Sequence, residues 1–284
     1  MSVSLIQHTN HRIMDSFSAT QGNLVANHGR DRGQQPVVGR SVNLASGLVS
    51  RRHAHPTAQF LYAAQGVMLA QTDGDEWVIP PTRGLWVPPN TPHRIRAIGD
   101  VHMRTLYFRP DAGVRLPIEC KVVGVSPLLR ELIVAAVEIR LPYPPDSRDA
   151  HLMRLLLDEI TVQDSLPLRL PYPVEPALAK ICRQVAQAPD NSRTLEDWAT
   201  RLGIHPKTLQ RRFLRETGLT FGQWRQQACL IQAFERLAVG EKVVDVALAL
   251  GYNSPTAFAS MFRRHLGVPP SAYFGQRSSR SASK

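Results

Sequence analysis

The spacing of apolar residues changes from a strand-like to a helical pattern along the chain. Over residues 35–120, short apolar runs such as Trp77-Val78-Ile79 alternate with Gly, Pro, Asn and Asp, and Thr72-Asp73-Gly74-Asp75 is typical of a hairpin turn. Many short strands with regular turns predict an antiparallel sandwich or small barrel. The segments that follow have the spacing of helices.

Two helices are predicted within residues 121–165. Ser126-Pro127 is typical of a helix start, because serine caps free backbone N–H groups and proline fits the first turn. A second apolar helical run begins near Ser147. We interpret this segment as a helical dimerisation segment; the alternative is that both helices pack on their own domain.

The remaining segments divide the chain into two domains. Residues 166–176 contain four prolines, which end any helix, so this segment is predicted to be the linker. Residues 177–275 have helical spacing throughout. Residues 1–34 are polar and are predicted to form a flexible arm, and the Ser- and Arg-rich residues 276–284 a disordered tail.

A helix-turn-helix pattern occurs twice in this helical region. In the first copy an apolar segment ends at Gly203 and a second helix opens at Pro206; Gly251 and Pro255 correspond to them in the second copy. Glycine readily takes the left-handed conformation that ends a helix. Residues 221–237 read as one long helix between the copies. Two copies at a fixed spacing predict a protein that reads two adjacent segments of the DNA major groove.

The second helix of each copy has an apolar side and a polar side. Leu209 and Phe213 face inward in the first copy, and Phe258 and Phe262 do so in the second. Arg and Lys suit guanine and phosphate, and Gln suits adenine. The less charged second copy is expected to make mainly phosphate contacts. The predicted DNA-binding residues are Lys207, Thr208, Gln210, Arg211 and Arg212 in the first copy and Thr256, Ala257, Ser260, Arg263 and Arg264 in the second.

The charge of the chain agrees with an anionic partner. The net charge is +11 and the pI about 10.2, and most of the excess lies from residue 175 onward. The sequence has no run of 18 apolar residues, and its three cysteines are too widely spaced for a zinc or disulfide pattern. These features predict a cytoplasmic protein without a membrane partner. The sequence also contains no phosphate-binding loop or dinucleotide motif.

Residues 177–275 resemble the AraC/XylS family of bacterial transcription regulators. The matching residues are Ala199, Gly203, Leu209, Arg211 and Phe213 in the first copy, and Asp245, Ala247, Gly251, Tyr252, Ser254, Phe258, Phe262, Gly267, Pro269, Pro270 and Tyr273 in the second. The resemblance implies binding to double-stranded promoter DNA, with RNA polymerase as a further partner.

The resemblance also assigns individual residues in the two copies. It places Lys207, Gln210 and Arg211 at base-facing positions of the first copy, and Thr256 and Ser260 at those of the second. There are two departures from the family pattern. His205 stands where the family usually has a Ser or Thr cap. Ser260 stands where many members have a base-contacting Arg or Lys, which weakens the expectation of base reading by the second copy.

A group of histidines in the strand-rich domain could form a ligand site. His53 and His55 are two residues apart, so on a strand they point to the same side, and His93 comes from a distant strand. This spacing, with Gln59, resembles the two motifs of the cupin barrel, whose metal ligands are three histidines and a glutamate. Gln59 occupies the glutamate position, which removes a charge that would help to hold a divalent ion. Two interpretations stay open: a divalent metal bound by His53, His55 and His93, and a hydrogen-bonded polar pocket for an organic effector.

Together these patterns predict an α+β multidomain protein. An N-terminal cupin-like β-barrel plus an αα segment is followed by an all-α C-terminal domain with a double helix-turn-helix. The predicted function is a homodimeric, sequence-specific transcriptional regulator, not an enzyme, controlled by a small-molecule or metal effector. The N-terminal domain also resembles a subgroup that often controls neighbouring efflux-transporter genes. The alternatives are a metal-dependent cupin enzyme fused to a DNA-binding domain, which Gln59 disfavours, and an architectural DNA binder, which the separate β domain disfavours.

Overall fold

A computed structural model describes residues 35–112, 117–161, 165–166, 168–189, 193–266 and 268–274. The predicted arm (1–34) and tail (276–284) lie outside these residues. Among the described helices, none is both long and apolar enough to cross a membrane.

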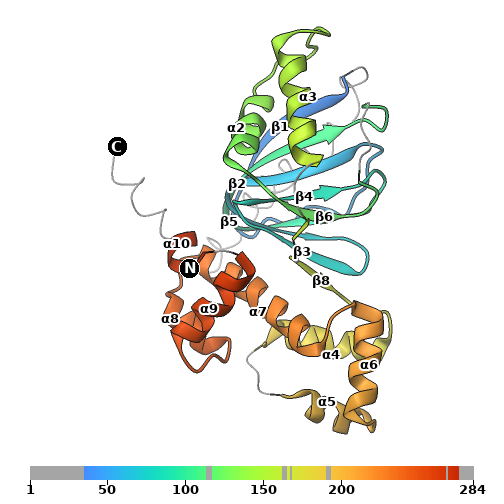
Figure 1. Cartoon of the computed structure of the whole chain (residues 1–284), viewed down its shortest axis with the longest axis vertical. Helices are drawn as coiled ribbons and strands as arrows, with labels where there is room; N and C mark the ends of the chain where they lie inside the picture. The colour runs from blue at the N-terminus through green and yellow to red at the C-terminus, as the bar shows by residue number, and fades with distance from the viewer. Residues whose placement is uncertain are drawn as a thin grey trace, which may run out of the picture.

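The described strands form a single antiparallel sheet (Figure 1). Its central pair is β2 and β5, the two longest strands, and the order across the sheet is β1-β5-β2-β4-β6-β7, with β3 between β2 and β8. The predicted hairpin turn joins β2 to β3, where the Thr72 N–H donates to the Asp75 carbonyl (3.0 Å). The strands are β1 (Val37–Leu44), β2 (Ala58–Gln71), β3 (Asp75–Ile79), β4 (Arg83–Val87), β5 (Arg94–Phe108), β6 (Lys121–Gly124), β7 (Ser165–Leu166) and β8 (Arg169–Pro171).

Two helices cover one face of this sheet. They are α2 (Pro127–Ala136) and α3 (Arg148–Thr161), and Ser126 caps α2 as predicted by accepting from the Leu129 N–H (3.1 Å). Their apolar sides share a buried cluster with sheet residues such as Phe60 and Trp86. These faces therefore pack on their own domain, which is the alternative that the sequence left open.

The structure differs from the predicted segments at three short strands. β6 lies inside the segment predicted to be helical, and β7 and β8 lie at or within the predicted linker. Strands of two to four residues are too short to show a period in the sequence. They form because the edges of the sheet present free backbone groups. Pro171 is tolerated because it is the last residue of the edge strand β8.

The C-terminal domain is helical, and its predicted helix ends are confirmed. Gly203 takes the left-handed conformation (φ 65°) at the end of the first helix of copy one. Ser254 caps the start of the second helix of copy two by accepting from the Ala257 N–H (3.1 Å). The helices are α4 (Pro176–Gln187), α5 (Leu195–Leu202), α6 (Pro206–Thr217), α7 (Phe221–Ala238), α8 (Val243–Ala249), α9 (Pro255–Leu266) and α10 (Pro270–Phe274).

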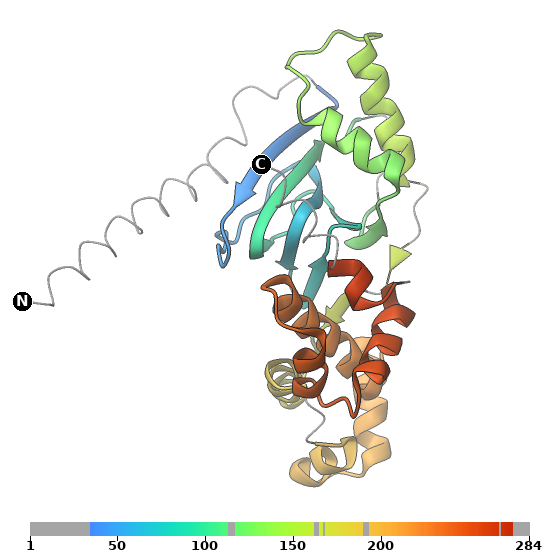
Figure 2. The same ribbon diagram turned by 90° about the vertical axis from the view of Figure 1, so that its left-hand side faces the viewer.

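The two domains are in contact through α7 and α10. In Figures 1 and 2 the C-terminal helices lie at the end of the sheet opposite α2 and α3. The Trp224 indole N–H donates to the Pro171 carbonyl (2.6 Å), and the hydroxyls of Thr82 and Tyr273 are 2.9 Å apart. A continuous apolar cluster joins the sheet to the helices. The sheet and the helical domain therefore share part of their core.

Two glycines give a matched test of this packing. A Cβ at Gly84 on β4 would overlap the ring of buried Phe60, whereas a Cβ at Gly222 on α7 would meet open space. We expect Gly84→Ala to destabilise the protein by about 1–3 kcal/mol through overpacking. We expect Gly222→Ala to be neutral or to stabilise it by about 0.4–1 kcal/mol. Thermal melting of both variants checks this; equal melting temperatures would contradict the close approach at Gly84.

Candidate DNA-binding surface and histidine site

The first helix-turn-helix consists of α5 and α6. Thr194 and Asp197 form a capping box at the start of α5. His205 caps α6, because its Nδ1 accepts from the Lys207 N–H (3.2 Å). His205 therefore serves as the N-cap residue, as the Ser or Thr expected at that position would. Leu209 and Phe213 are buried, which fixes the outward side of α6.

The predicted DNA-binding residues of α6 fall into two groups. Lys207 and Arg211 are exposed, whereas Thr208, Gln210 and Arg212 are half-buried. The Arg212 guanidinium lies 3.4 Å from Glu175, and the Gln210 amide nitrogen is covered without a hydrogen-bond partner. Lys207 and Arg211 are therefore the members of the set best placed to reach DNA, and Arg212 ties α6 to the start of α4.

The second helix-turn-helix consists of α8 and α9. Phe258 and Phe262 are fully buried, as predicted. The outward residues of α9 are all exposed: Thr256, Ala257, Ser260, Arg263 and Arg264. The two arginines are in the last turn of the helix, while its first turns present small polar and methyl groups. The outward side of α9 thus carries less positive charge in its first turns than the outward side of α6 does.

Helix α7 holds both motifs. Trp224 near its start packs edge to face on Phe213 of α6 (6.0 Å between ring centroids), and Phe234 near its end packs on Phe262 of α9 (5.5 Å). Both α7 residues are fully buried. The helix therefore sets the distance and orientation between the two outward surfaces.

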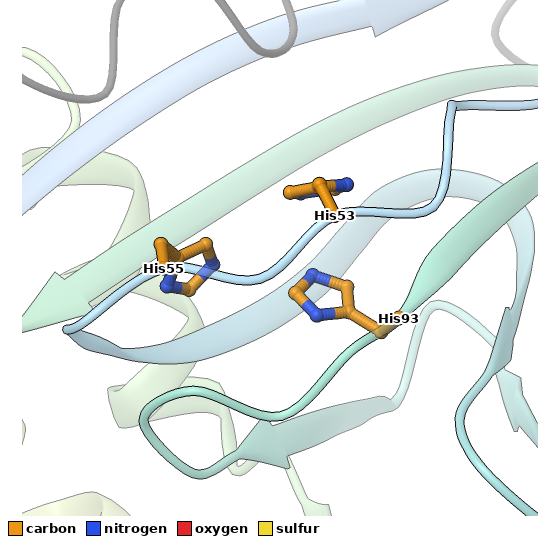
Figure 3. Close-up of side chains that lie close together, drawn as sticks. All are labelled: His53, His55 and His93. Atoms are coloured by element: carbon orange, nitrogen blue, oxygen red, sulfur yellow. The ribbon is translucent and has the colours of Figure 1, made fainter.

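The structure brings the three predicted histidines of the sheet domain together (Figure 3). His53 and His93 form an isolated antiparallel bridge just before β5, and His55 lies in the loop that leads into β2. One ring nitrogen from each histidine lies within 4.8 Å of the others. His55 and His93 are 5% and 0% exposed, and His53 is half-buried. Residues that are distant in sequence thus form one compact cluster.

Backbone carbonyls orient each of these rings. The Nδ1 atom of His53 lies 2.9 Å from the Arg51 carbonyl, that of His55 2.7 Å from the Thr57 carbonyl, and that of His93 2.9 Å from the Thr91 carbonyl. Since a carbonyl only accepts, each Nδ1 carries the proton and donates. A neutral ring then has its lone pair on Nε2. This is the arrangement in which histidines ligate metal ions through Nε2.

Gln59 on β2 completes the cluster. Its Oε1 lies 3.0 Å from the Nε2 atoms of both His55 and His93, and its amide N–H groups donate to Thr105 Oγ1 (2.8 Å) and the Tyr107 hydroxyl (3.1 Å). Burial lowers the pKa of His55, an effect that the Gln59 oxygen partly opposes because it would accept a hydrogen bond from the protonated ring. A second proton on His55 is therefore disfavoured. The Nε2 lone pairs of His55 and His93 meet the Gln59 oxygen here, and a cation would satisfy all three.

Thr105 and Tyr107 were missed by the sequence reasoning. Both lie on β5, and Tyr107 is directly opposite Gln59 in the β2–β5 pairing. They are buried, and they hold the Gln59 amide in place. The sequence does show two polar side chains at alternate positions of a predicted strand. It does not show the strand register that places them beside Gln59.

A sensor-type sheet domain joined to two helix-turn-helix motifs defines a DNA-binding transcriptional regulator with a ligand-binding domain. The family model described as the AraC-like ligand binding domain matches residues 45–197, and the model described as a helix-turn-helix domain matches residues 198–276. The chain belongs to the AraC family of transcriptional regulators, as the resemblance of residues 177–275 indicated.

Several known proteins are similar to this chain. The HTH-type transcriptional regulator NimR of Escherichia coli (strain K12) is 32% identical over 229 residues, which are 81% of this chain and 84% of NimR. The uncharacterized HTH-type transcriptional regulator YobQ of Bacillus subtilis (strain 168) is 22% identical over 78% of this chain and 87% of its own length. A structure of ToxT from Vibrio cholerae, 11% identical, covers 85% of this chain and 98% of ToxT with a TM-score of 0.36.

Arg211, an exposed arginine of α6, gives a test of base reading. We expect Arg211→Ala to weaken binding to a site enriched from random DNA by about 1–3 kcal/mol, because a contact to a base edge is lost. The measurement is a titration of the full-length protein at fixed salt.

Arg215→Ala is the matched control. Arg215 is an exposed arginine in the last turn of the same helix, and it pairs with Glu216 (3.5 Å). Its loss removes the same charge and should weaken binding less, and equally on random DNA. Equal losses for the two variants would count against base contact by Arg211.

Proposed function

We propose that the three-histidine site binds a divalent transition-metal ion and that its occupancy controls how this regulator holds promoter DNA. The observation that carries the proposal is the orientation of the rings. All three Nδ1 atoms donate to backbone carbonyls, so the Nε2 lone pairs of buried His55 and His93 turn toward Gln59 Oε1. His53 adds a third imidazole within reach of the same ion.

The ligand set favours one class of ion. Neutral imidazoles suit zinc, iron, copper and nickel, whereas calcium and magnesium prefer several charged oxygens. The three histidines and Gln59 contribute no negative charge. A bound ion would keep its positive charge and could anchor an anionic group of a small-molecule effector.

An organic effector bound without a metal is the second candidate. With the Gln59 amide turned by 180°, its N–H groups would donate to both imidazoles, and its oxygen would accept from the hydroxyls of Thr105 and Tyr107. The same contact distances fit this arrangement. The cluster is then a polar lining for an organic molecule.

The regulator is proposed to act as a homodimer at a promoter, where it also contacts RNA polymerase. Leu128 on α2 and Leu155 on α3 are 50% and 45% exposed on the helices that cover the sheet, which favours a second copy as their partner. The family resemblance adds a neighbouring efflux-transporter gene as the proposed target. Effector binding would shift the population of dimer arrangements and so change promoter occupancy.

Metal content is the direct test. We expect purified full-length protein to contain about one transition-metal ion per chain, and His55→Ala and His93→Ala to lose it, because each variant removes one nitrogen ligand. Elemental analysis measures this. His102→Ala, at a histidine of β5 outside the cluster, is the control and should keep the ion.

The outcomes separate the candidates. Metal retained in both cluster variants would contradict the proposed ligands. Protein without metal under every condition would leave the organic effector, and would also remove the basis for a metal-dependent enzyme. In the full-length protein, the two cluster variants should lose the change in operator affinity that metal causes in the wild type.

Gln59→Glu tests whether the side chain at position 59 takes part in binding the ion. A carboxylate at this position would add a negative charge beside the three imidazoles, so we expect metal to bind about tenfold or more tightly. A metal titration of the stripped protein measures the change. An unchanged Kd would show that the side chain at position 59 does not contact the ion.

A further inference from the structure

The contact between the sheet and α7 includes one ion pair. Arg96 on β5 pairs with Glu235 on α7. Glu76 on β3 lies beside this pair: its pKa is raised by burial and further by the charge of Glu235, and lowered in part by Arg96. Two carboxylates therefore lie near the Arg96 guanidinium at the boundary between the domains, and Arg94 also lowers the pKa of Glu76. A displacement of Arg96 would leave them to repel each other.

The packing beside this ion pair leaves room for movement. A cavity of about 220 Å³ lies between the two domains. The charged and polar residues Glu76, Arg96, Arg183, Tyr172, Gln232 and Glu235 are part of its lining. Because such a cavity can hold water, the ion pair can shift without opening an apolar void. The rest of the boundary is held by apolar packing and by the Trp224 and Tyr273 hydrogen bonds.

Arg96 is also directly connected to the histidine site. It follows His93 by three residues, and the segment that carries His53 pairs with this part of the chain. The backbone hydrogen bonds of this ladder are His53 N to His93 O (3.0 Å), Ser50 N to Ile95 O (2.8 Å) and Ala97 N to Leu48 O (2.9 Å), with Val49 opposite Arg96. Side chains alternate along a strand, so buried His93, Ile95 and Ala97 point one way. Arg96 points the other way, toward α7.

We propose that the Arg96–Glu235 ion pair is the contact through which occupancy of the three-histidine site changes the position of α7. The inference rests on the proposed function of that site. A ligand that draws His53 and His93 together distorts the backbone pairing that also carries Arg96. The Arg96 guanidinium then points in a different direction. Because α7 holds both helix-turn-helix motifs, a change at Glu235 alters the placement of both DNA-reading helices. The two sites are then linked by a coupling free energy.

Operator binding with and without metal tests this coupling. The probe is Zn²⁺ added to stripped full-length protein, and the readout is the Kd for a site enriched from random DNA. We expect zinc to change the wild-type Kd by about 5- to 150-fold. In Glu235→Gln the change should fall to within about twofold while one zinc per chain is retained. The charge swap Arg96→Glu with Glu235→Arg should restore part of the response.

Glu241→Gln is the matched control. Glu241 pairs with Arg236 (2.8 Å) at the end of α7, entirely within the DNA-binding domain. This variant loses the same charge near the same helix and should keep the wild-type zinc response. A zinc response in Glu235→Gln equal to that of the wild type would overturn the proposal.

A measurement without metal separates this inference from the proposed function. If the wild type binds no zinc, the metal proposal fails, and a double-mutant cycle of His93→Ala with Glu235→Gln on operator Kd decides the coupling. Distant, uncoupled sites are additive, so a departure of more than about threefold supports the contact and additivity overturns it.

Discussion

The burial of α7 is the interaction on which the rest of the structure depends. Trp224 and Phe234 of this helix are fully buried, and each packs on a buried phenylalanine in the second helix of one helix-turn-helix. The same helix lies against β2, β5 and β8 of the sheet. The burial of large aromatic side chains makes a large favourable contribution to the free energy of packing α7. The spacing of the two helix-turn-helix motifs and their attachment to the sensor domain are therefore set by one element.

The histidine site and the DNA-binding surface differ in how their side chains are held. His53, His55 and His93 each have one nitrogen tied to a carbonyl, and Gln59 is tied to two hydroxyls. Such fixed side chains suit a site that must recognise a ligand by geometry. Lys207 and Arg211 are exposed on α6 instead. Long exposed cations can adjust to phosphates and base edges as DNA approaches.

The helical domain could be predicted from the sequence almost in full. Gly203, Pro206 and Ser254 act through local backbone chemistry, and buried residues such as Phe213 and Phe258 repeat at helical spacing. The sheet could be predicted less fully from the sequence. Its strands at 121–124 and 169–171 carry no period, and they exist because β3 and β4 offer edges to pair with. The same limit hid Thr105 and Tyr107, since their place beside Gln59 depends on strand register.

The sequence alone thus determined the class of protein, the positions of the second helix of each helix-turn-helix and the histidines that gather in the N-terminal domain. These features follow from caps, periodicity and motif spacing, all of which act over a few residues. Only the tertiary structure decided which ring nitrogens face one another, which cations of α6 stay exposed, and that Arg96 meets Glu235 across the domain boundary. Those contacts join residues far apart in the chain, and only packing of the whole molecule brings them together.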